Sequence, residues 1–252
     1  MNVLITGASS RLAQEIAAEL RNDHYLRLMD TVPVEPGEKS QFMQGSILDA
    51  DDAWKAVRGM DVLIHTGEPP PNLPPEGLER EQMLLDLATR GTHNIFKAAV
   101  DAGIKRLLYA GTLSIFRAYP DDVYISELWK PLPSPNMPEM AKYLGELTCR
   151  EFTRDYMVMV TTLRLGELVL EEEVIGQTPN LMWLDLRDAA QAFRYAMSRD
   201  TSQRVWWTQR WVMYHICTDI PNPKFLIDNA VQGLGYKPTH NFTSHWDTKR
   251  KD

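Results

Sequence analysis

Apolar positions along the chain follow two alternating patterns. Short uninterrupted apolar runs predict strands at residues 3–6, 25–30, 41–46, 61–66, 106–110 and 158–165. Between them, apolar positions recur with helical spacing, which predicts helices at 12–20, 51–58, 76–102 and 137–156. Strands that are apolar throughout need cover on both faces of their sheet. The alternation therefore predicts an α/β fold, a doubly wound Rossmann-like parallel sheet followed by a small C-terminal lobe.

The pattern is less regular after residue 170. It predicts helices at 186–197 and 225–234, with a strand-like aromatic run at 205–216 between them. Trp206, Trp207 and Trp211 in this run either stack on a sugar, cover a partner surface or pack in the core. The polar residues 241–252 are expected to fray.

Composition narrows the class of partner. The chain has 252 residues, 44% of them apolar, a net charge of −7 and a pI near 5.4. An acidic chain without a basic block is a poor partner for nucleic acid or a membrane surface, and the sequence holds no transmembrane run. Cys149 and Cys217 show no paired spacing and are interpreted as reduced, buried thiols of a cytoplasmic protein. The histidines lack metal-site spacing, so no metal is expected.

The first predicted strand leads into a turn that is typical of a phosphate site. Gly7 supplies the tight turn, while Ser10 and Ala13 stand where such turns often carry two further glycines. Alanine is small enough for close packing. The Ser10 side chain either intrudes where the backbone would approach a phosphate or donates a hydrogen bond of its own to that phosphate. Asp30 ends the second strand at the place where a carboxylate binds the ribose hydroxyls of an adenosine. Because this carboxylate would repel a 2′-phosphate, the pattern favours NAD over NADP.

Several segments in their order resemble the extended short-chain dehydrogenase/reductase family, the NAD-dependent epimerase/dehydratase group. They are LITGASSRLA, GSILDADDAWKAVRGMDVLIHTGE, ATRGTHNIFKAAVDAGIKRLLYAGTLSIF, MAKYLGE, VTTLRLGELV and LMWLDLRDAAQAF. The shortness after residue 170 resembles the compact uronate dehydrogenase branch. The resemblance implies an NAD-binding Rossmann-like region at 1–170 and, in the same domain, a reduced substrate-binding lobe at 171–240.

The resemblance also implies which residues contact the cofactor. Ser46 replaces an acidic residue that holds the adenine amino group, and Ile47 next to it packs on the adenine ring. His65, Thr66 and Gly67 form the turn after the fourth strand, although His65 is also interpreted as a structural histidine. The implied cofactor-binding set is Gly7, Ser9, Ser10, Arg11, Leu12, Asp30, Ser46, Ile47, His65, Thr66, Gly67 and Lys142.

The family's chemistry uses a serine or threonine, a tyrosine and a lysine. The resemblance places Thr112 at the hydroxyl position, where it orients the substrate oxygen, and Lys142 at the lysine position, on the nicotinamide ribose. The tyrosine should stand four residues before Lys142, where this chain has Pro138. Asn136 and Glu139 have the spacing of a capping box and proline suits a first helical turn, so we expect the helix to start in the family's register.

A substitute for the missing phenol is left open. Tyr143 points about 100° around the helix from Lys142 and is expected to pack. Tyr119, Tyr124 or Glu139 could reach into the site from their loops. The two proline-rich segments, 67–77 and 130–140, are interpreted either as rigid connectors or as walls of a substrate pocket.

Two functions of different kind follow. One is an NAD-dependent oxidoreductase or epimerase acting on a sugar or sugar acid with an atypical acid/base. The other is a catalytically inactive NAD-binding sensor or partner module, and a chain that binds no dinucleotide is a third, weaker reading. The long helix after Glu76 and the Lys142 helix resemble the pair through which the family dimerises, so a homodimer is expected.

Overall fold

A seven-stranded parallel sheet organises the molecule. The computed structural model describes residues 1–199 and 206–246. The strands lie in the order β3-β2-β1-β4-β5-β6-β9. Their bounds are β1 (Asn2–Thr6), β2 (Tyr25–Asp30), β3 (Ser40–Gln44), β4 (Val62–His65), β5 (Arg106–Thr112), β6 (Met159–Leu165) and β9 (Trp211–Ile216). This order confirms the predicted doubly wound Rossmann-like fold.

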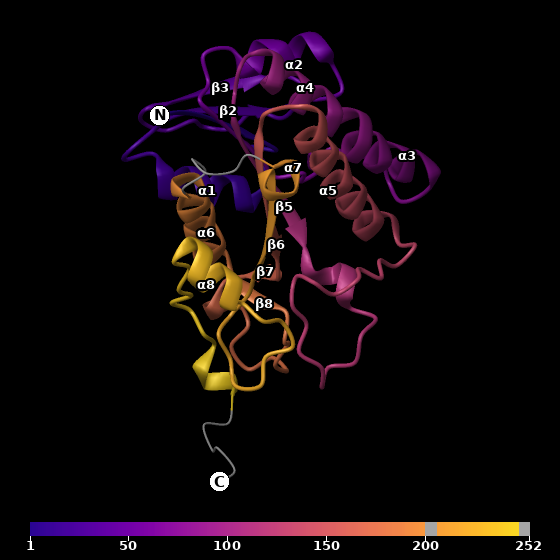
Figure 1. The fold of residues 1–252 in the computed structure, drawn as a ribbon, viewed down its shortest axis with the longest axis vertical. Helices are drawn as coiled ribbons and strands as arrows, with labels where there is room; N and C mark the ends of the chain where they lie inside the picture. The colour runs from indigo at the N-terminus through magenta and orange to yellow at the C-terminus, as the bar shows by residue number, and fades with distance from the viewer. Residues whose placement is uncertain (200–205, 247–252) are drawn as a thin grey trace.

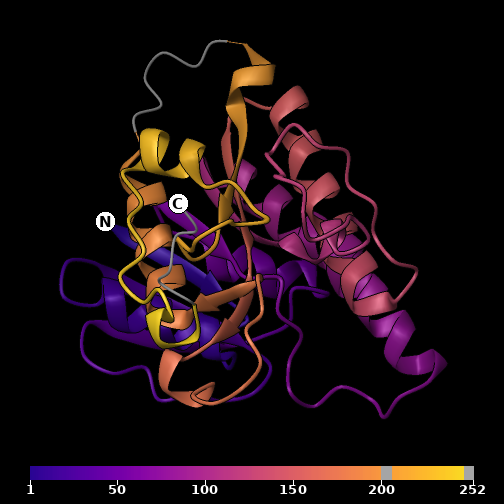
Figure 2. The same ribbon diagram turned by 90° about the horizontal axis from the view of Figure 1, so that it is seen from below.

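Helices cover both faces of the sheet (Figure 1). One face carries α1 (Arg11–Leu20) and α6 (Leu186–Ser198), with α8 (Asp228–Leu234) beside α6; the other carries α2 (Ala50–Val57), α4 (Thr92–Asp101) and α5 (Met137–Asp155). Each layer encloses its own cluster of buried apolar side chains. Figure 2 shows α3 (Leu78–Asp86) running beside α5 at the margin of the molecule.

The order of the strands reverses at β1. This strand pairs with β2 on one side and with β4 on the other, all in parallel. Crossovers leave in opposite directions from such a point, so a crevice opens outside the carboxyl ends of β1 and β4, where open α/β sheets bind ligands.

The single helix expected at 76–102 is broken. The chain forms α3, then a π-helical turn η1 (Leu87–Gly91), then α4. A Cβ atom on Gly91 would lie 2.8 Å from the Ile47 side chain, so a larger residue there would have to displace that side chain. Turns of this kind frequently occur at functional sites, and Leu87 and Ala88 line the main cavity.

The region after residue 170 shares the core of the first part. β9 extends the main sheet and α6 packs against α1. Outside that sheet, β7 (Glu167–Val169) pairs with β8 (Trp183–Asp185), with the turn η3 (Glu171–Glu173) between them. The strand expected at 205–216 is wrong in its first half, because α7 (Trp207–Arg210) precedes β9; Val205 lies outside the described residues.

The tail expected to fray from residue 241 is packed as far as residue 246. A short turn, η4 (Thr243–His245), places the Phe242 ring in full burial against Trp183, with Trp246 beside it. Two aromatic residues within a polar stretch therefore anchor it. Residues 247–252 lie outside the described part of the chain.

Candidate functional site

The main cavity lies beyond the carboxyl ends of β4, β5 and β6, beside the start of α5. Its volume is about 630 Å³. It brings together Thr112 from the end of β5, Lys142 and Pro138 from α5, and Glu68 from the segment after β4. Residues that are 74 positions apart in the sequence thus meet at one sheet edge, as the sequence predicted for Thr112 and Lys142.

Both proline-rich segments wall this cavity. Glu68 and Pro69 come from the first segment, and Ser134, Asn136 and Pro138 come from the second. Proline holds each segment extended, which keeps the two walls apart without regular secondary structure. Of the two interpretations of these segments, the pocket walls are the one that the structure favours.

The turn after β1 has the conformation that a phosphate loop needs. Gly7 has a φ of +70°, and a Cβ atom there would lie 2.4 Å from the Thr66 hydroxyl. The Ser10 hydroxyl is folded back: it donates to the Gly7 carbonyl at 2.8 Å and accepts from the Ala13 amide at 3.2 Å. Ser10 is thus the N-cap of α1 and stabilises the turn instead of offering its hydroxyl to a ligand.

Two amides remain open at this helix start. The backbone N–H groups of Arg11 and Leu12 have no acceptor among the described residues. Unpaired amides and the positive end of the helix dipole together favour an anion. Leu12 offers only its amide, because its side chain is buried. The Arg11 guanidinium is held by both carboxyl oxygens of Glu173, at 2.7 and 2.9 Å.

Asp30 lies beside this turn at the end of β2. One carboxyl oxygen accepts from the Ser9 amide and hydroxyl at 2.9 and 2.8 Å. The other accepts from the Thr31 amide at 2.7 Å. These bonds fix the carboxylate against the loop and leave it at the wall of a second, smaller cavity of about 40 Å³. Ser9 therefore acts on Asp30 through its side chain.

The residues expected around the adenine line the smaller cavity. Ser46 and Ile47 line it next to Asp30 and Gly7. The Ser46 hydroxyl accepts from the Leu48 amide at 3.2 Å, so it shapes its own turn. Glu68 lines both cavities and stands between them.

In the turn after β4, the side chains of His65 and Thr66 bond to other groups of the protein and so have a structural role. The His65 ring bonds the Thr6 hydroxyl at 2.7 Å and the Thr92 hydroxyl at 3.0 Å. Burial, with the charge of Lys142 as a second cause, lowers the pKa of His65 to about 3. The ring is therefore neutral and occupied, which leaves its backbone as the only part for a ligand. Thr66 is buried, its hydroxyl donating to the Thr6 carbonyl, and Gly67 has a φ of +58° against the Tyr109 ring.

Thr112 and Lys142 carry the polar chemistry of the main cavity. The Thr112 hydroxyl accepts from the Ser114 amide at 3.1 Å, which leaves its own hydrogen for another acceptor. The Lys142 ammonium donates to the Thr66 carbonyl and to Glu68, both at 2.7 Å. The Lys142 side chain is only 16% exposed, so this ion pair is partly shielded from water.

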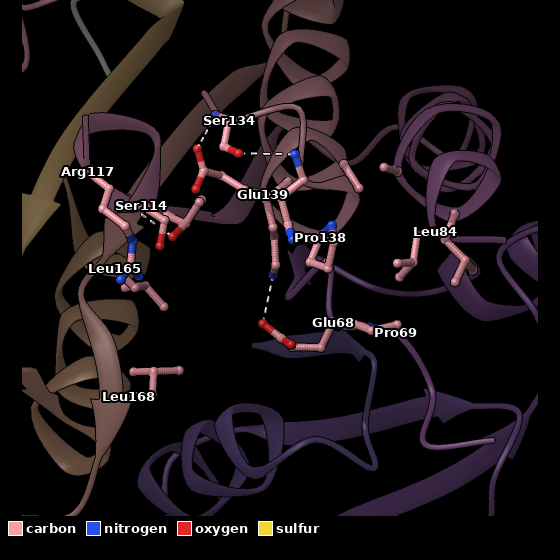
Figure 3. A pocket seen from close by; sticks show the side chains of 18 of the residues that line it. Glu68, Pro69, Leu84, Ser114, Arg117, Ser134, Pro138, Glu139, Leu165 and Leu168 are labelled. Carbon is pink, nitrogen blue, oxygen red and sulfur yellow. Dashed lines mark hydrogen bonds and ion pairs between the residues drawn. The ribbon is translucent and has the colours of Figure 1, made fainter. Parts of the chain in front are cut away.

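Helix α5 begins at Met137, as expected, but without the expected cap. Asn136 is the N-cap residue, and its side chain makes no capping bond. The Glu139 carboxyl accepts from the Ser134 amide at 2.5 Å rather than from the Asn136 amide, which donates to the Ser134 hydroxyl. The capping box is therefore wrong, because the preceding loop folds Ser134 back towards the helix. Figure 3 shows Glu139 directed towards Ser114 and Ser134, with Pro138 on the side of Glu68.

A buried ion pair holds α5 against the sheet. Glu146, one turn after Lys142, accepts from Arg164 of β6 with contacts of 2.6 to 3.3 Å. The two side chains are 2% and 3% exposed. Gly145 brings the helix close, since a Cβ atom there would lie 2.2 Å from the Tyr109 hydroxyl, which donates to the Lys142 carbonyl. These contacts fix the direction in which Lys142 points.

The other residues singled out in the sequence lie outside the main cavity. The Tyr119 hydroxyl donates to the Lys130 carbonyl, and Tyr143 packs against the apolar cluster around Phe116, as expected. Tyr124 is more than half exposed and does not line the cavity. Trp211 stands at the first residue of β9, at the opposite end of the strands, and the Trp207 side chain lies outside what the structure describes.

Sequence reasoning missed two lining residues, Glu68 and Arg117. Arg117 follows the short helix η2 (Leu113–Phe116), and its guanidinium has no hydrogen-bond or ion-pair partner within the described chain. Figure 3 places Arg117 on the same side as Ser114 and Glu139. The signal that could have identified both residues was a charged side chain in the loop that follows a strand of the sheet.

Side chains that commonly ligate metals do not gather at one place in the described part of the chain. The described residues contain no cluster of three metal-ligating side chains. Cys149 and Cys217 are free and buried, as expected, and burial raises the pKa of the Cys217 thiol to about 12. No helix within residues 1–199 and 206–246 is long and apolar enough to span a bilayer.

Comparison with known proteins gives a consistent picture. The model of the NAD dependent epimerase/dehydratase family matches residues 3–180. The NAD-dependent glucose-6-phosphate dehydrogenase of Haloferax volcanii is 26% identical over 95% of this chain and 93% of its own length. The uronate dehydrogenase of Pseudomonas syringae pv. tomato is 24% identical over 82% of this chain and 78% of its own length.

Solved structures share the fold at low identity. A glucuronic acid dehydrogenase from Chromohalobacter salexigens superimposes with a TM-score of 0.78 at 17% identity, covering 100% of this chain and 91% of that chain. A mutant uronate dehydrogenase from Agrobacterium tumefaciens complexed with NAD gives a TM-score of 0.76 at 18% identity, covering 100% and 92%.

Proposed function

Because the chain belongs to the NAD dependent epimerase/dehydratase family, we propose that it binds NAD and acts as an oxidoreductase or epimerase on a sugar or sugar acid. The observation that carries this proposal is the arrangement at the sheet edge. The open amides of Arg11 and Leu12 stand beside Asp30, and the same edge opens into the cavity that holds Thr112 and Lys142.

The residues present fit a dinucleotide. The Gly7 turn and the amides of Arg11 and Leu12 suit the diphosphate, and Asp30 suits the adenosine ribose. Ser46 and Ile47 border the space for adenine, while Lys142 borders the space for the second ribose. Ser9, Ser10 and the backbone of residues 65–67 lie behind the residues named above and hold them in place. The Asp30 carboxylate would repel a 2′-phosphate, so the proposal is NAD rather than NADP.

When bound, the dinucleotide supplies a two-electron acceptor for a hydride from a carbinol carbon. The protein has to hold the sugar and manage its proton. Thr112 keeps a free hydroxyl hydrogen with which it can orient the reacting oxygen. Arg117 is exposed at the wall of the cavity and has no ion-pair partner among the described residues, so it suits a carboxylate or phosphate of the sugar. Two relatives are named as dehydrogenases of a sugar phosphate and of uronates, which supports this class.

Binding and turnover test the proposal separately. Thermal unfolding should shift upwards with NAD and much less with NADP at equal concentration. Formation of NADH should then be followed with D-glucuronate, D-galacturonate, D-glucose 6-phosphate and L-arabinose. Arg117→Met should weaken the binding of the anionic sugars at least tenfold relative to that of arabinose. Absence of any NAD-induced shift would overturn the proposal.

A second candidate, an NAD-binding module without catalysis, is favoured by one observation. Pro138 stands four residues before Lys142, where the resemblance implies a tyrosine, and the Lys142 ammonium is held by Glu68. Loss of an acid/base group typically removes about 10²–10⁴ of rate. NAD binding with no turnover of any of the four sugars would select this candidate.

We further propose that the protein is a cytoplasmic homodimer. Leu78 and Leu85 of α3 are 69% and 38% exposed, on the helix that runs beside α5. A dimer that pairs these helices would cover both leucines. Light scattering after size exclusion should give twice the mass of 28.9 kDa, and Leu85→Glu should return it to the monomer mass. The free buried thiols agree with a reducing compartment.

A further inference from the structure

The main cavity has no phenol where the reaction needs a proton acceptor. No tyrosine is among the described residues that line it, and Pro138 carries no ionisable group. The Tyr109 hydroxyl is buried and bonded to the Lys142 carbonyl, and burial raises the pKa of Tyr109 well above its ordinary value. The proton must therefore go to another residue of the wall.

Four lining side chains can carry charge: Glu68, Arg117, Glu139 and Lys142. Arginine stays protonated and cannot accept a proton. The Lys142 ammonium donates to the Glu68 carboxylate at 2.7 Å, so the charge of each side chain is already paired with that of the other. Glu139 alone is an acceptor without a cationic partner among the described residues.

Glu139 is held in a way that leaves one oxygen open. Oε1 accepts from the Ser134 amide at 2.5 Å, while Oε2 has no donor within the described residues. The residue lies in the first turn of α5, where the helix dipole favours an acidic side chain. Figure 3 shows its carboxyl on the side of Ser114 and Arg117, so it faces the part of the cavity in which the sugar would lie.

We propose that Glu139 is the acid/base of this site and takes the place of the absent tyrosine, an inference that rests on the proposed function. In the oxidation, the substrate O–H bond breaks and its proton passes to Glu139 Oε2. The adjacent C–H bond would break with its electron pair passing as a hydride to the bound dinucleotide, and a C=O bond would form. Thr112 donates its hydroxyl hydrogen to the same substrate oxygen. In the reverse direction Glu139 returns the proton.

Glu139→Gln tests this assignment with little change of shape, because the amide oxygen can still accept from Ser134. We expect unchanged thermal unfolding and an unchanged shift with NAD, but turnover of the best sugar reduced by about 10²–10⁴. Glu151→Gln on the same helix, facing solvent, is the matched control and should keep wild-type turnover. Glu139→Ala should lose turnover as well, and added formate should restore part of it, a rescue that a purely structural role would not show.

The outcomes separate the two proposals. Failure of the wild type to bind NAD overturns the proposed function itself. NAD binding without turnover of any sugar overturns the Glu139 assignment and selects the non-catalytic module. Turnover in Glu139→Gln within threefold of wild type, or no rescue of Glu139→Ala by formate, overturns the assignment and leaves the proposed function standing.

Discussion

The buried pair between Glu146 and Arg164 offers the sharpest test of how the site is held. The two side chains are 2% and 3% exposed and share three nitrogen–oxygen contacts. Glu146→Gln leaves the Arg164 charge buried without compensation. Breaking such a pair on one side costs about 3–5 kcal/mol, and we expect about 3 because the amide oxygen still accepts one bond.

The double variant Glu146→Leu/Arg164→Met removes both charges and should cost less than Glu146→Gln alone, since well-packed apolar replacements of buried pairs are often neutral. Urea unfolding, read as the free energy at an unchanged m-value, measures both. Glu151→Gln breaks an exposed pair with Arg154 on the same helix and should cost about 0–1 kcal/mol. A loss of stability below 1 kcal/mol in Glu146→Gln, or a double variant that is less stable than Glu146→Gln, would refute the reasoning.

Three further predictions concern the proton balance and the cofactor turn. His65 and His215 are buried with pKa values lowered to about 3, so the unfolded chain binds their protons first and stability falls as the pH drops below the unfolded value. Between pH 7.5 and 5.5 each should cost about 1.4 kcal/mol, so His215→Phe should reduce the pH dependence seen in urea unfolding by about 1.4 kcal/mol. Pro138→Tyr, one turn before Lys142, should raise turnover of the Glu139→Gln variant at least tenfold in the NADH assay. Ser10→Ala should lower stability by about 1 kcal/mol and Ser10→Gly by less, while only the glycine should bind NAD more tightly by titration.

The sheet was predictable because its signal is local. Most of the strands are short, mainly apolar runs between polar turns; β2 at 25–30 was placed to the residue, and the parallel arrangement followed. The segment 76–102 was predicted as one helix because a π-helical turn keeps the apolar spacing, so the pattern of apolar residues does not reveal the break. The aromatic run at 205–216 was assigned as strand throughout because tryptophan favours strands, although part of it forms α7.

The site was predictable where a residue type at a fixed spacing carries the chemistry. The family resemblance assigned Thr112 to the hydroxyl position and Lys142 to the lysine position, and both line the cavity. The bonding of each side chain was not accessible. His65 turned out to be occupied on both ring nitrogens, and Glu139 bonds Ser134 instead of Asn136. Such choices depend on how loops fold back, which no periodicity encodes.

Glu68 is a wall of both cavities and the partner of the Lys142 ammonium. Glu68 therefore borders the proposed sites of both the dinucleotide and the sugar, so the binding affinity of each would depend on the other. By linkage, whatever factor a dinucleotide imposes on sugar binding through Glu68, the sugar imposes on the dinucleotide in return. Because Glu68 shares the Lys142 ammonium with the Thr66 carbonyl, a molecule that displaces this carboxylate would leave the ammonium without its counter-charge.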